Sequence, residues 1–435
     1  MWQNSSVFYQ IYPFGAFGAP FENDGVLEHR LQRIYAYIPK LEELGIDCIL
    51  FNPLFQSHTH GYDTIDYKNV DVRLGDNEDL IEVMDTLHAH KIRVIFDAVF
   101  NHVGRGFFAF EDVLKNREQS RYKDWFYIDF WNNNNYDDHL SYQNWEGNNN
   151  LVKLNLQNPE VVQYLLSVVD FWMDIFHVDG LRLDVAYCLD HNFLRMLHTH
   201  VKSKNPEFFL LGETLHGDYN QWVNESMLDS CTNYECYKGL YSSFNSKNLF
   251  EICHSYNRQF GKDPWCLYTG KHLFNFVDNH DVVRIASILE NKKHLPLIYT
   301  MMMNMPGIPC IYYGSEWGIE GKKNWNDSEL RPEIKELESN DLTKFIQKLI
   351  AIKHEQIALQ MGDYETVSLT NQACIFKRQY ENEIVFTCVN MEENSVQFQL
   401  NFSGKMLDLL ENTEISIENN VILKPLSVRI LKAIM

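Results

Sequence analysis

The chain has 435 residues, enough for two or three domains or for one large barrel with additions. Hydrophobic residues make up 45% and charged residues 22%, which excludes long disorder, collagen and small disulfide-held folds. The 38 Lys and Arg against 59 Asp and Glu give a formal net charge of −21. This charge disfavours nucleic acids and anionic membranes as partners, because phosphate groups attract cationic surfaces.

Short apolar runs alternate with amphipathic stretches along residues 1–360. The apolar runs predict strands at residues 7–12, 48–51, 92–96, 180–185, 208–212, 273–277 and 309–313. The amphipathic stretches predict helices at residues 30–44, 77–90, 158–176 and 192–202. Gly45 is expected to end the first helix, Asn77 to cap the second, and Asn158 with Pro159 to start the third. This alternation predicts an α/β fold with a parallel sheet, and about eight such units predict a (β/α)8 TIM barrel.

Two segments interrupt the alternation. Residues 102–157 have little periodicity but contain Trp125, Trp131 and Trp145, too many large apolar side chains for a disordered insertion, so a small inserted domain is expected. After residue 361, runs that alternate apolar and polar residues predict a C-terminal antiparallel β-domain, a β-sandwich spanning 361–435. The predicted catalytic barrel therefore comprises residues 1–101 and 158–360.

No targeting or membrane-spanning segment is predicted. The N-terminal residues have no early positive charge, the first being Arg30, and no long apolar run, unlike a secretory signal. The apolar stretch 295–314 contains three prolines, which predicts a helix, a loop and a strand instead of a membrane span. The nine cysteines are scattered and form no CxxC pair, so we expect reduced thiols in a cytoplasmic protein without a zinc motif.

Four predicted strands each end close to a carboxylate: Asp97, Asp184, Glu213 and Asp281. Taken singly, each is better explained as a turn residue or a helix cap. In a barrel, however, these strand ends share one rim, where clustered carboxylates shift each other's pKa values and form an active site. Paired carboxylates in a cleft are typical of glycoside hydrolysis, which needs one acid and one nucleophile or base.

The residues around two of these carboxylates suggest different roles. Arg182 and Asp184 are two apart on a strand and share a face, so the guanidinium is expected to keep Asp184 ionised as a nucleophile. Glu213 follows an apolar run, and partial burial would raise its pKa, as a general acid requires. We expect a carboxyl separation of about 5–5.5 Å, the spacing of retaining enzymes.

The motifs DAVFNHVG (97–104), GLRLDVA (180–186), GETLH (212–216) and FVDNHD (276–281) resemble the four ordered signature regions of the α-amylase family. The resemblance implies a barrel with an inserted domain and a C-terminal β-domain. It implies that Asp184 is the nucleophile, Glu213 the general acid/base and Asp281 a third carboxylate that supports the transition state. It further implies a sugar-binding or supporting role for Tyr62, Asp97, His102, Arg182, His216, His280 and Arg284.

Within the family, residues 153–155 resemble a fifth region of the cyclomaltodextrinase, neopullulanase and maltogenic amylase group. That group commonly has an N-terminal β-domain used for dimerisation. Here the first barrel strand is expected by Val7, so that domain is expected to be absent and the oligomeric state is open. Leu215 stands where the group often has Trp, which bears on the balance between hydrolysis and glycosyl transfer.

The resemblance requires no cofactor and leaves calcium open. Asn101 matches a calcium ligand of many members, but Cys188 stands where a ligand histidine is common, and a thiol is a poor calcium ligand. Residues 22–24 form a different acidic cluster that an Asn-Asp-Gly turn explains better.

The function that the resemblance implies is retaining hydrolysis of α-1,4-glucosidic bonds in maltooligosaccharides, with cyclodextrins as further candidate substrates. One alternative is an α-1,6-acting or transglycosylating member of the family. The other is a non-catalytic glucan-binding member, which typically loses the catalytic carboxylates that this chain keeps.

Overall fold

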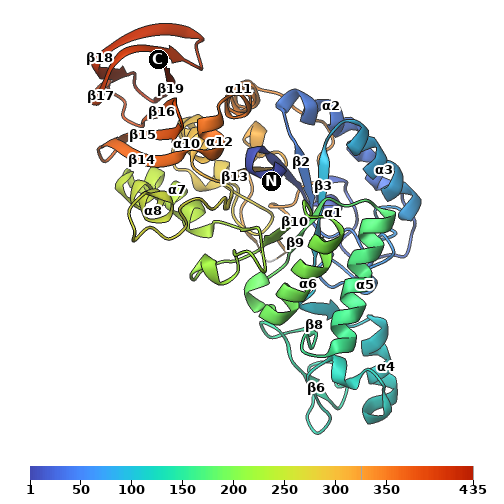
Figure 1. The fold of residues 1–435 in the computed structure, drawn as a ribbon. Coiled ribbons are helices and arrows are strands. Elements are labelled where there is room, and N and C mark those ends of the chain that lie inside the picture. Colours follow the sequence, from blue (N-terminus) through green and yellow to red (C-terminus); the bar gives the residue numbers. More distant parts are fainter. Residues whose placement is uncertain (325, 435) are drawn as a thin grey trace.

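The computed structural model describes residues 1–324 and 326–434. Eight parallel strands pair in the order β11-β10-β9-β3-β2-β1-β13-β12. They are β1 (Phe8–Ile11), β2 (Cys48–Phe51), β3 (Arg93–Ala98), β9 (Gly180–Leu183), β10 (Phe209–Gly212), β11 (Ser230–Cys231), β12 (Phe274–Asn275) and β13 (Ile308–Tyr312). A parallel bridge between Thr232 and Phe274 joins the two ends of the sheet, so the strands close into the predicted barrel (Figure 1).

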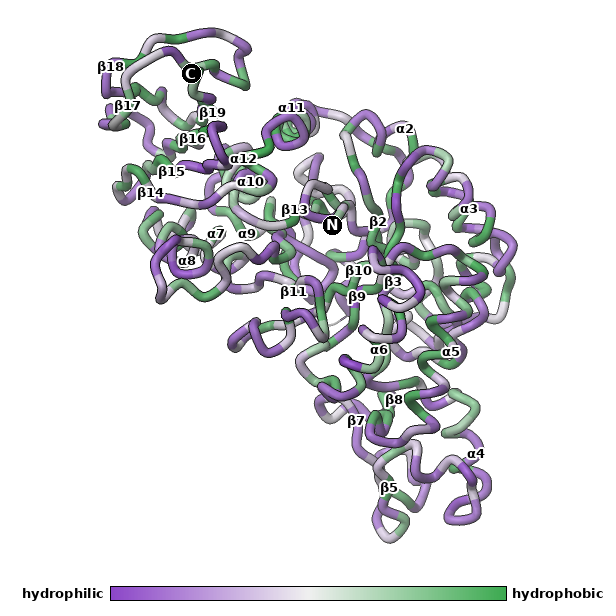
Figure 2. Tube along the Cα trace, in the orientation of Figure 1, coloured by the Kyte–Doolittle hydropathy of each residue, from purple (hydrophilic) through white to green (hydrophobic). Residues whose placement is uncertain are grey.

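Helices cover the outside of the barrel (Figure 1). The longer ones are α2 (Ile34–Leu44), α3 (Asn77–Ala89), α5 (Pro159–Ile175), α6 (His191–Lys204), α7 (Tyr234–Ser246), α8 (Phe250–Phe260), α10 (Leu295–Asn304) and α11 (Asp341–Glu355). Short helices are α1 (Pro13–Ala16), α9 (Ile285–Ile288) and α12 (Ile357–Met361). Figure 2 shows hydrophobic positions recurring along α5, whose apolar face packs inward at Val161, Leu165, Val168 and Trp172.

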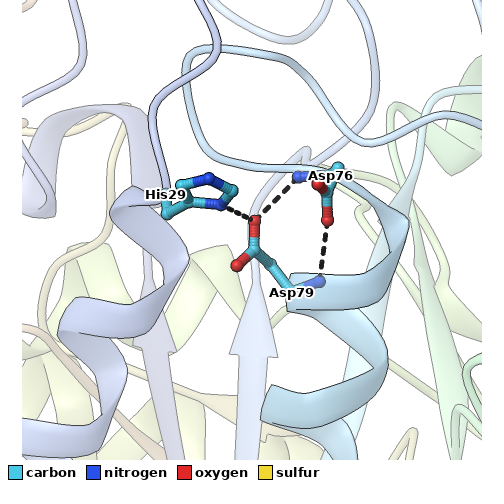
Figure 3. Close-up of side chains that lie close together, drawn as sticks. All are labelled: His29, Asp76 and Asp79. Atoms are coloured by element: carbon cyan, nitrogen blue, oxygen red, sulfur yellow. Dashed lines mark hydrogen bonds and ion pairs between the residues drawn. The ribbon is translucent and has the colours of Figure 1, made fainter.

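The predicted helix signals are confirmed with one exception. Gly45 ends α2 at φ +87°, a left-handed conformation that favours glycine, and the Asn158 side chain caps α5 by accepting from the Glu160 N–H. The cap of α3 is Asp76 and not the expected Asn77. Asp76 and Asp79 each accept a hydrogen bond from the other's backbone N–H, forming a capping box (Figure 3). Asn77 lies inside the helix, and its side chain accepts from the Val70 N–H.

The segment between β3 and β9 forms a small folded unit that projects from the barrel (Figure 1). It contains β4 (His102–Gly104), α4 (Phe108–Asn116), β5 (Ile128–Asp129), β6 (Ser141–Tyr142), β7 (Asn144–Trp145) and β8 (Asn148–Lys153). The antiparallel sheets are β4-β8-β7 and β5-β6. Trp125 and Tyr142 are buried in the same hydrophobic core as the barrel, so the segment is held by apolar packing.

Six C-terminal strands form one antiparallel sheet in the order β14-β15-β16-β19-β17-β18. They are β14 (Asp363–Leu369), β15 (Ala373–Tyr380), β16 (Glu383–Asn390), β17 (Val396–Asp408), β18 (Thr413–Leu423) and β19 (Ser427–Ala433). The antiparallel β-domain is as expected, and hydrogen bonds join all six of its strands into one continuous sheet. The long strands β17 and β18 shift register between Gln399 and Ser403.

The apolar stretch 295–314 folds as predicted, into α10, a loop and β13. Among the described residues, no helix combines the length and the apolar character that crossing a membrane requires. All nine cysteines are free thiols, and seven of them are buried.

Candidate active site

A cleft of about 630 Å³ opens where the barrel strands end. Asp184 directly follows β9 and Glu213 directly follows β10. The cleft is lined by five of the predicted site residues, Tyr62, His102, Asp184, Glu213 and Asp281, and also by Leu215. The inserted unit adds one wall, through Trp145 and its neighbours in the β7–β8 hairpin. The structure therefore brings the predicted carboxylates to one rim of the barrel.

Arg182 lies at the centre of these carboxylates. Its Nη1 donates to both oxygens of Asp97, at 2.7 and 2.8 Å, and to Oδ1 of Asp184 at 2.9 Å. Its Nη2 lies 2.9 Å from Oε2 of Glu213. Burial alone would lower the pKa of Arg182, but the surrounding carboxylates raise it well above its usual range. One guanidinium thus connects acidic groups that follow or belong to three adjacent strands, β3, β9 and β10.

Asp184 and Glu213 are both buried, and burial raises the pKa of each. Arg182 opposes this rise in both cases, while the charge of Glu213 adds to it at Asp184. The spacing of Arg182 and Asp184 in the sequence predicts that the guanidinium holds Asp184 ionised. The structure shows a shared guanidinium whose effect is divided between the two acids, so the pair retains a proton more readily than two exposed carboxylates would.

Asp281 is the carboxylate whose pKa moves in the opposite direction. Burial would raise it, but His280 and Arg331 lower it below the usual range. Nε2 of His280 lies 3.0 Å from Oδ2, and Nη2 of Arg331 donates to Oδ1 at 2.9 Å. The pKa of Asp281 is therefore lowered, whereas burial raises the pKa of both Asp184 and Glu213.

Tyr62 and His280 form a stacked pair beside these acids, with ring centroids 5.6 Å apart and planes within 6°. The Tyr62 hydroxyl donates to Oδ2 of Asp97 at 2.9 Å and lies 2.5 Å from Nε2 of His280. Gln10 and Asn52, which the sequence analysis did not identify, contact the same histidine. Asp97 is buried behind Tyr62 and Arg182, so it positions these side chains and is not in the cleft lining.

His102 and Trp145 place two hydrogen-bond donors at the cleft. Within the described residues, Nε2 of His102 and Nε1 of Trp145 are buried and have no partner. Asn101 Nδ2 contacts Nδ1 of His102 at 3.2 Å, which makes Nδ1 the acceptor and leaves the proton on Nε2. Burial lowers the pKa of His102 to about 3, so the ring is neutral. Both N–H groups are available to a ligand that offers hydroxyl oxygens.

The other aromatic residues of the inserted unit lie elsewhere. Trp125 and Tyr142 are buried in its core, and Trp131 is 95% exposed on the β5–β6 connection, outside the cleft lining. Of the three tryptophans that the sequence places in this insertion, Trp145 is the one that lines the cleft.

Five of the predicted sugar-binding or supporting residues are not in the cleft lining: Asp97, Arg182 and His280, which contact the acids or Tyr62, and also Arg284 and His216. Arg284 is fully buried, and its guanidinium donates to the backbone carbonyls of Tyr313 and Leu330. It therefore supports the loops behind the site. His216 is exposed, and its ring lies 6.2 Å from that of Tyr187, which does line the cleft.

Asp327 and Arg331 line the cleft but were missed by the sequence analysis. They lie in the irregular segment between β13 and α11, with no strand directly before them, so the rule that located the other carboxylates does not reach them. Arg331 stacks over the Tyr12 ring at 4.8 Å and pairs with Asp281, and Oδ1 of Asp327 is buried with no partner in the described part of the chain.

Asn101 offers one unpartnered buried oxygen, Oδ1, within the described residues. Calcium takes six to eight oxygen ligands, so this oxygen alone does not make a calcium site. The turn at residues 22–24 is explained locally, because Asn23 and Asp24 accept from the N–H groups of Gly25 and Val26. His29, Asp76 and Asp79 come close enough for a metal, but their polar atoms already bind one another (Figure 3).

The model of the alpha amylase catalytic domain matches residues 19–356. The chain belongs to the α-amylase family. It is 33% identical over 410 residues to a cyclomaltodextrinase of Thermoanaerobacter pseudethanolicus, covering 92% of this chain and 70% of the relative. Neopullulanase 2 of Thermoactinomyces vulgaris is 33% identical over 445 residues, covering 95% and 74%. A solved cyclomaltodextrinase structure superposes with a TM-score of 0.88 at 27% identity, covering 99% and 78%. This α-amylase family chain is a glycoside hydrolase.

Proposed function

We propose that this family member hydrolyses α-1,4-glucosidic bonds in maltooligosaccharides with retention at the anomeric carbon, and that it also accepts cyclodextrins. The main support is the contact of one guanidinium, Arg182, with Asp97, Asp184 and Glu213 beside a cleft that also contains Asp281. The similarity to relatives named cyclomaltodextrinase and neopullulanase favours maltodextrin substrates.

Asp184 is the proposed nucleophile. Its Oδ1 accepts from Arg182, and none of the described residues donates to its Oδ2. Oδ2 is therefore the oxygen that forms the bond to the anomeric carbon as the glycosidic C–O bond breaks. The Arg182 contact fixes the plane of the carboxylate and limits its rotation.

Glu213 is the proposed general acid and base. Its Oε2 accepts from the Val185 N–H at 2.9 Å and contacts Arg182, so the proton resides on Oε1. Oε1 delivers that proton to the departing sugar oxygen. In the second step, Glu213 accepts a proton from water while the water oxygen attacks the anomeric carbon and releases Asp184.

The remaining cleft residues are suited to a neutral, polyhydroxylated ligand. The unpartnered N–H groups of His102 and Trp145 donate to sugar hydroxyls, and the Tyr62 ring faces the site as an apolar surface. Asp281 keeps its negative charge and stabilises the positive charge that develops on the sugar in the transition state.

The test is product analysis with maltotriose, pullulan and a cyclodextrin, with the first-formed anomer followed by NMR. We expect α-anomeric products from maltotriose and the cyclodextrin. β-anomeric products would overturn retention. Cleavage of pullulan only at α-1,6 bonds, or products longer than the substrate, would favour the α-1,6-acting or transglycosylating alternative.

The Asp184→Asn variant tests the nucleophile. It removes the attacking charge with almost no change in shape, so turnover of maltotriose should fall by at least about 10⁴-fold while the melting temperature stays close to that of the wild type. Substantial remaining turnover would reject Asp184 as the nucleophile.

We also propose a cytoplasmic location, supported by nine free thiols of which seven are buried. Fractionation of cells that express the chain tests this proposal, and recovery in the secreted fraction would contradict it.

A further inference from the structure

A large aromatic side chain that the proposed mechanism does not use lies next to a cleft-lining histidine, just outside the cleft lining itself. Phe21 is 55% exposed, and its ring centroid lies 6.4 Å from that of His60. His60 itself lines the cleft and precedes Tyr62 by two residues. Single exposed aromatic residues are common on protein surfaces, and what distinguishes Phe21 is its place beside a histidine of the cleft.

The backbone that presents Phe21 is firmly anchored. Nη1 of Arg73 donates to the carbonyl oxygens of Pro20, Phe21 and Thr59, at 3.1, 2.6 and 2.7 Å. Arg73 is fully buried and pairs with the equally buried Asp71 at 2.8 Å. A single buried guanidinium thus fixes Phe21 and the residue before His60 relative to each other. The exposed ring is a pre-organised surface on an ordered backbone.

The neighbouring segments connect Phe21 to the rest of the cleft. The Tyr12 hydroxyl donates to the His60 carbonyl at 2.8 Å, and the Tyr12 ring lies under Arg331, another cleft residue. The Ala16 carbonyl accepts from the N–H of Ile334, three residues after Arg331. The segment before Phe21 is therefore held between the two chain segments that supply His60 and Arg331.

His60 adds a polar group next to the phenyl ring. Its Nδ1 accepts from the Tyr62 N–H at 3.2 Å, which places the ring proton of the neutral imidazole on Nε2. Burial lowers the pKa of His60, so the ring is neutral. An apolar ring face beside an N–H donor matches a sugar, which has apolar C–H faces and hydroxyl oxygens at its edge.

We propose that Phe21 and His60 form an outer sugar-binding position, at which the Phe21 ring stacks on a glucose unit of a long maltooligosaccharide. The inference rests on the proposed function and deepens it, because it makes Phe21 a determinant of chain-length preference. A short oligosaccharide engages this position less than a long one does, so the contribution of Phe21 grows with substrate length.

The experiment compares kcat/KM for maltoheptaose and maltotriose in the wild type, Phe21→Ala and Phe21→Trp. In Phe21→Ala, the ratio of kcat/KM for maltoheptaose to kcat/KM for maltotriose should fall by about 3- to 10-fold. The fall should come mainly from a higher KM for maltoheptaose, because the aromatic contact with the sugar is lost. Phe21→Trp keeps an aromatic face and should restore most of the ratio. Trp131→Ala is the matched control and should leave the ratio as in the wild type, because it removes an exposed aromatic on the β5–β6 connection that lies against no cleft-lining ring among the described residues.

Each other outcome contradicts the inference. An equal loss for both substrates in Phe21→Ala would assign Phe21 a general structural role, and an unchanged ratio would show that the ring contacts no sugar. Failure of Phe21→Trp to restore the ratio would argue against stacking. The wild type tests the proposed function separately: if it cleaves neither substrate, that function fails, whereas an active wild type with an unchanged ratio in Phe21→Ala overturns the outer position alone.

Discussion

Two of the buried guanidinium groups of the chain lie in very different surroundings. In the cleft, Arg182 contacts three carboxylates, which raise its pKa well above the usual range although burial opposes them. At the junction of the barrel and the C-terminal sheet, Arg378 on β15 donates to the backbone carbonyls of Gly362 and Asn304. Within the described residues no carboxylate pairs with Arg378 at ion-pair distance, and burial lowers its pKa to about 9.

The junction contains a second buried cation of the same kind. Nζ of Lys353 on α11 contacts the carbonyl oxygens of Met303 at 3.3 Å and Leu359 at 3.1 Å, and burial lowers its pKa well below the usual range. These carbonyls belong to the last turns of α10 and α12, where the helix dipole is negative. Backbone carbonyls thus accept the hydrogen bonds of both groups, but they offset the cost of burying the charge only in part, because both pKa values are lowered. The cleft instead assembles full negative charges, which reaction chemistry needs.

The comparison predicts that loss of Arg182 acts mainly on catalysis. Arg182→Met leaves the buried acids without their shared cation, so the nucleophile is no longer oriented and kcat should fall by about 10³-fold. Stability should fall as well, by about 3–5 kcal/mol, because buried charges lose their partner. The measurements are kcat on maltotriose and unfolding in urea.

Arg182→Lys is the companion variant, because it keeps the charge and tests geometry. A lysine offers one ammonium and cannot reach all three carboxylates in a planar fork, so kcat should still fall by about 10²-fold with a smaller loss of stability. Near-normal kcat in Arg182→Lys would show that charge alone suffices and that the forked contact has no catalytic importance.

Much of the active site was predictable from the sequence, because most of its acids lie at the end of a strand that can be recognised from its own residues. Buried barrel strands such as β2 and β10 are uninterrupted apolar runs, and Glu213 follows such a run directly. Asp184 follows β9, which is apolar except for Arg182. The signal fails for β11, whose two residues, Ser230 and Cys231, are too few to form a pattern. It fails for Asp327 and Arg331 too, because a long irregular segment separates them from any strand.

The buried cationic side chains at the junction of the barrel and the C-terminal sheet could not be predicted from the sequence around them. Arg378 lies in an alternating strand, where a charged residue is expected to face solvent, and Lys353 lies in the last turn of a helix, where a cation is common at the surface. Their burial depends on which surfaces of the barrel and the C-terminal sheet meet. The same holds for the sheet itself, since alternation predicts strands but not whether their hydrogen bonds join one sheet or two.

Arg378→Met at the junction is the counterpart of Arg182→Met in the cleft, and it should lower stability without lowering kcat. Arg378→Met removes the donor to the carbonyls of Gly362 and Asn304, and buried acceptors without a partner cost about 1–3 kcal/mol. The midpoint of urea unfolding should fall accordingly, while kcat on maltotriose, measured well below the melting temperature, should match the wild type. A large loss of kcat in a folded Arg378→Met protein would mean that the junction is coupled to the cleft.

Lys353 gives the smallest effect, and it depends on pH. Because burial lowers the pKa of Lys353 in the folded state, the unfolded chain binds this proton more tightly, and stability rises with pH between the lowered pKa and the ordinary lysine value. Lys353→Met removes this titrating group. As pH rises from the lowered pKa toward the ordinary lysine value, the unfolding free energy of the wild type should therefore increase relative to that of the variant. Urea unfolding at a series of pH values measures the difference, in which the titration of all other groups cancels to first order. If this difference in unfolding free energy did not change with pH, the helix-end carbonyls would offset the whole cost of burying the Lys353 ammonium. The junction would then stabilise a buried positive charge as well as the carboxylates of the cleft do.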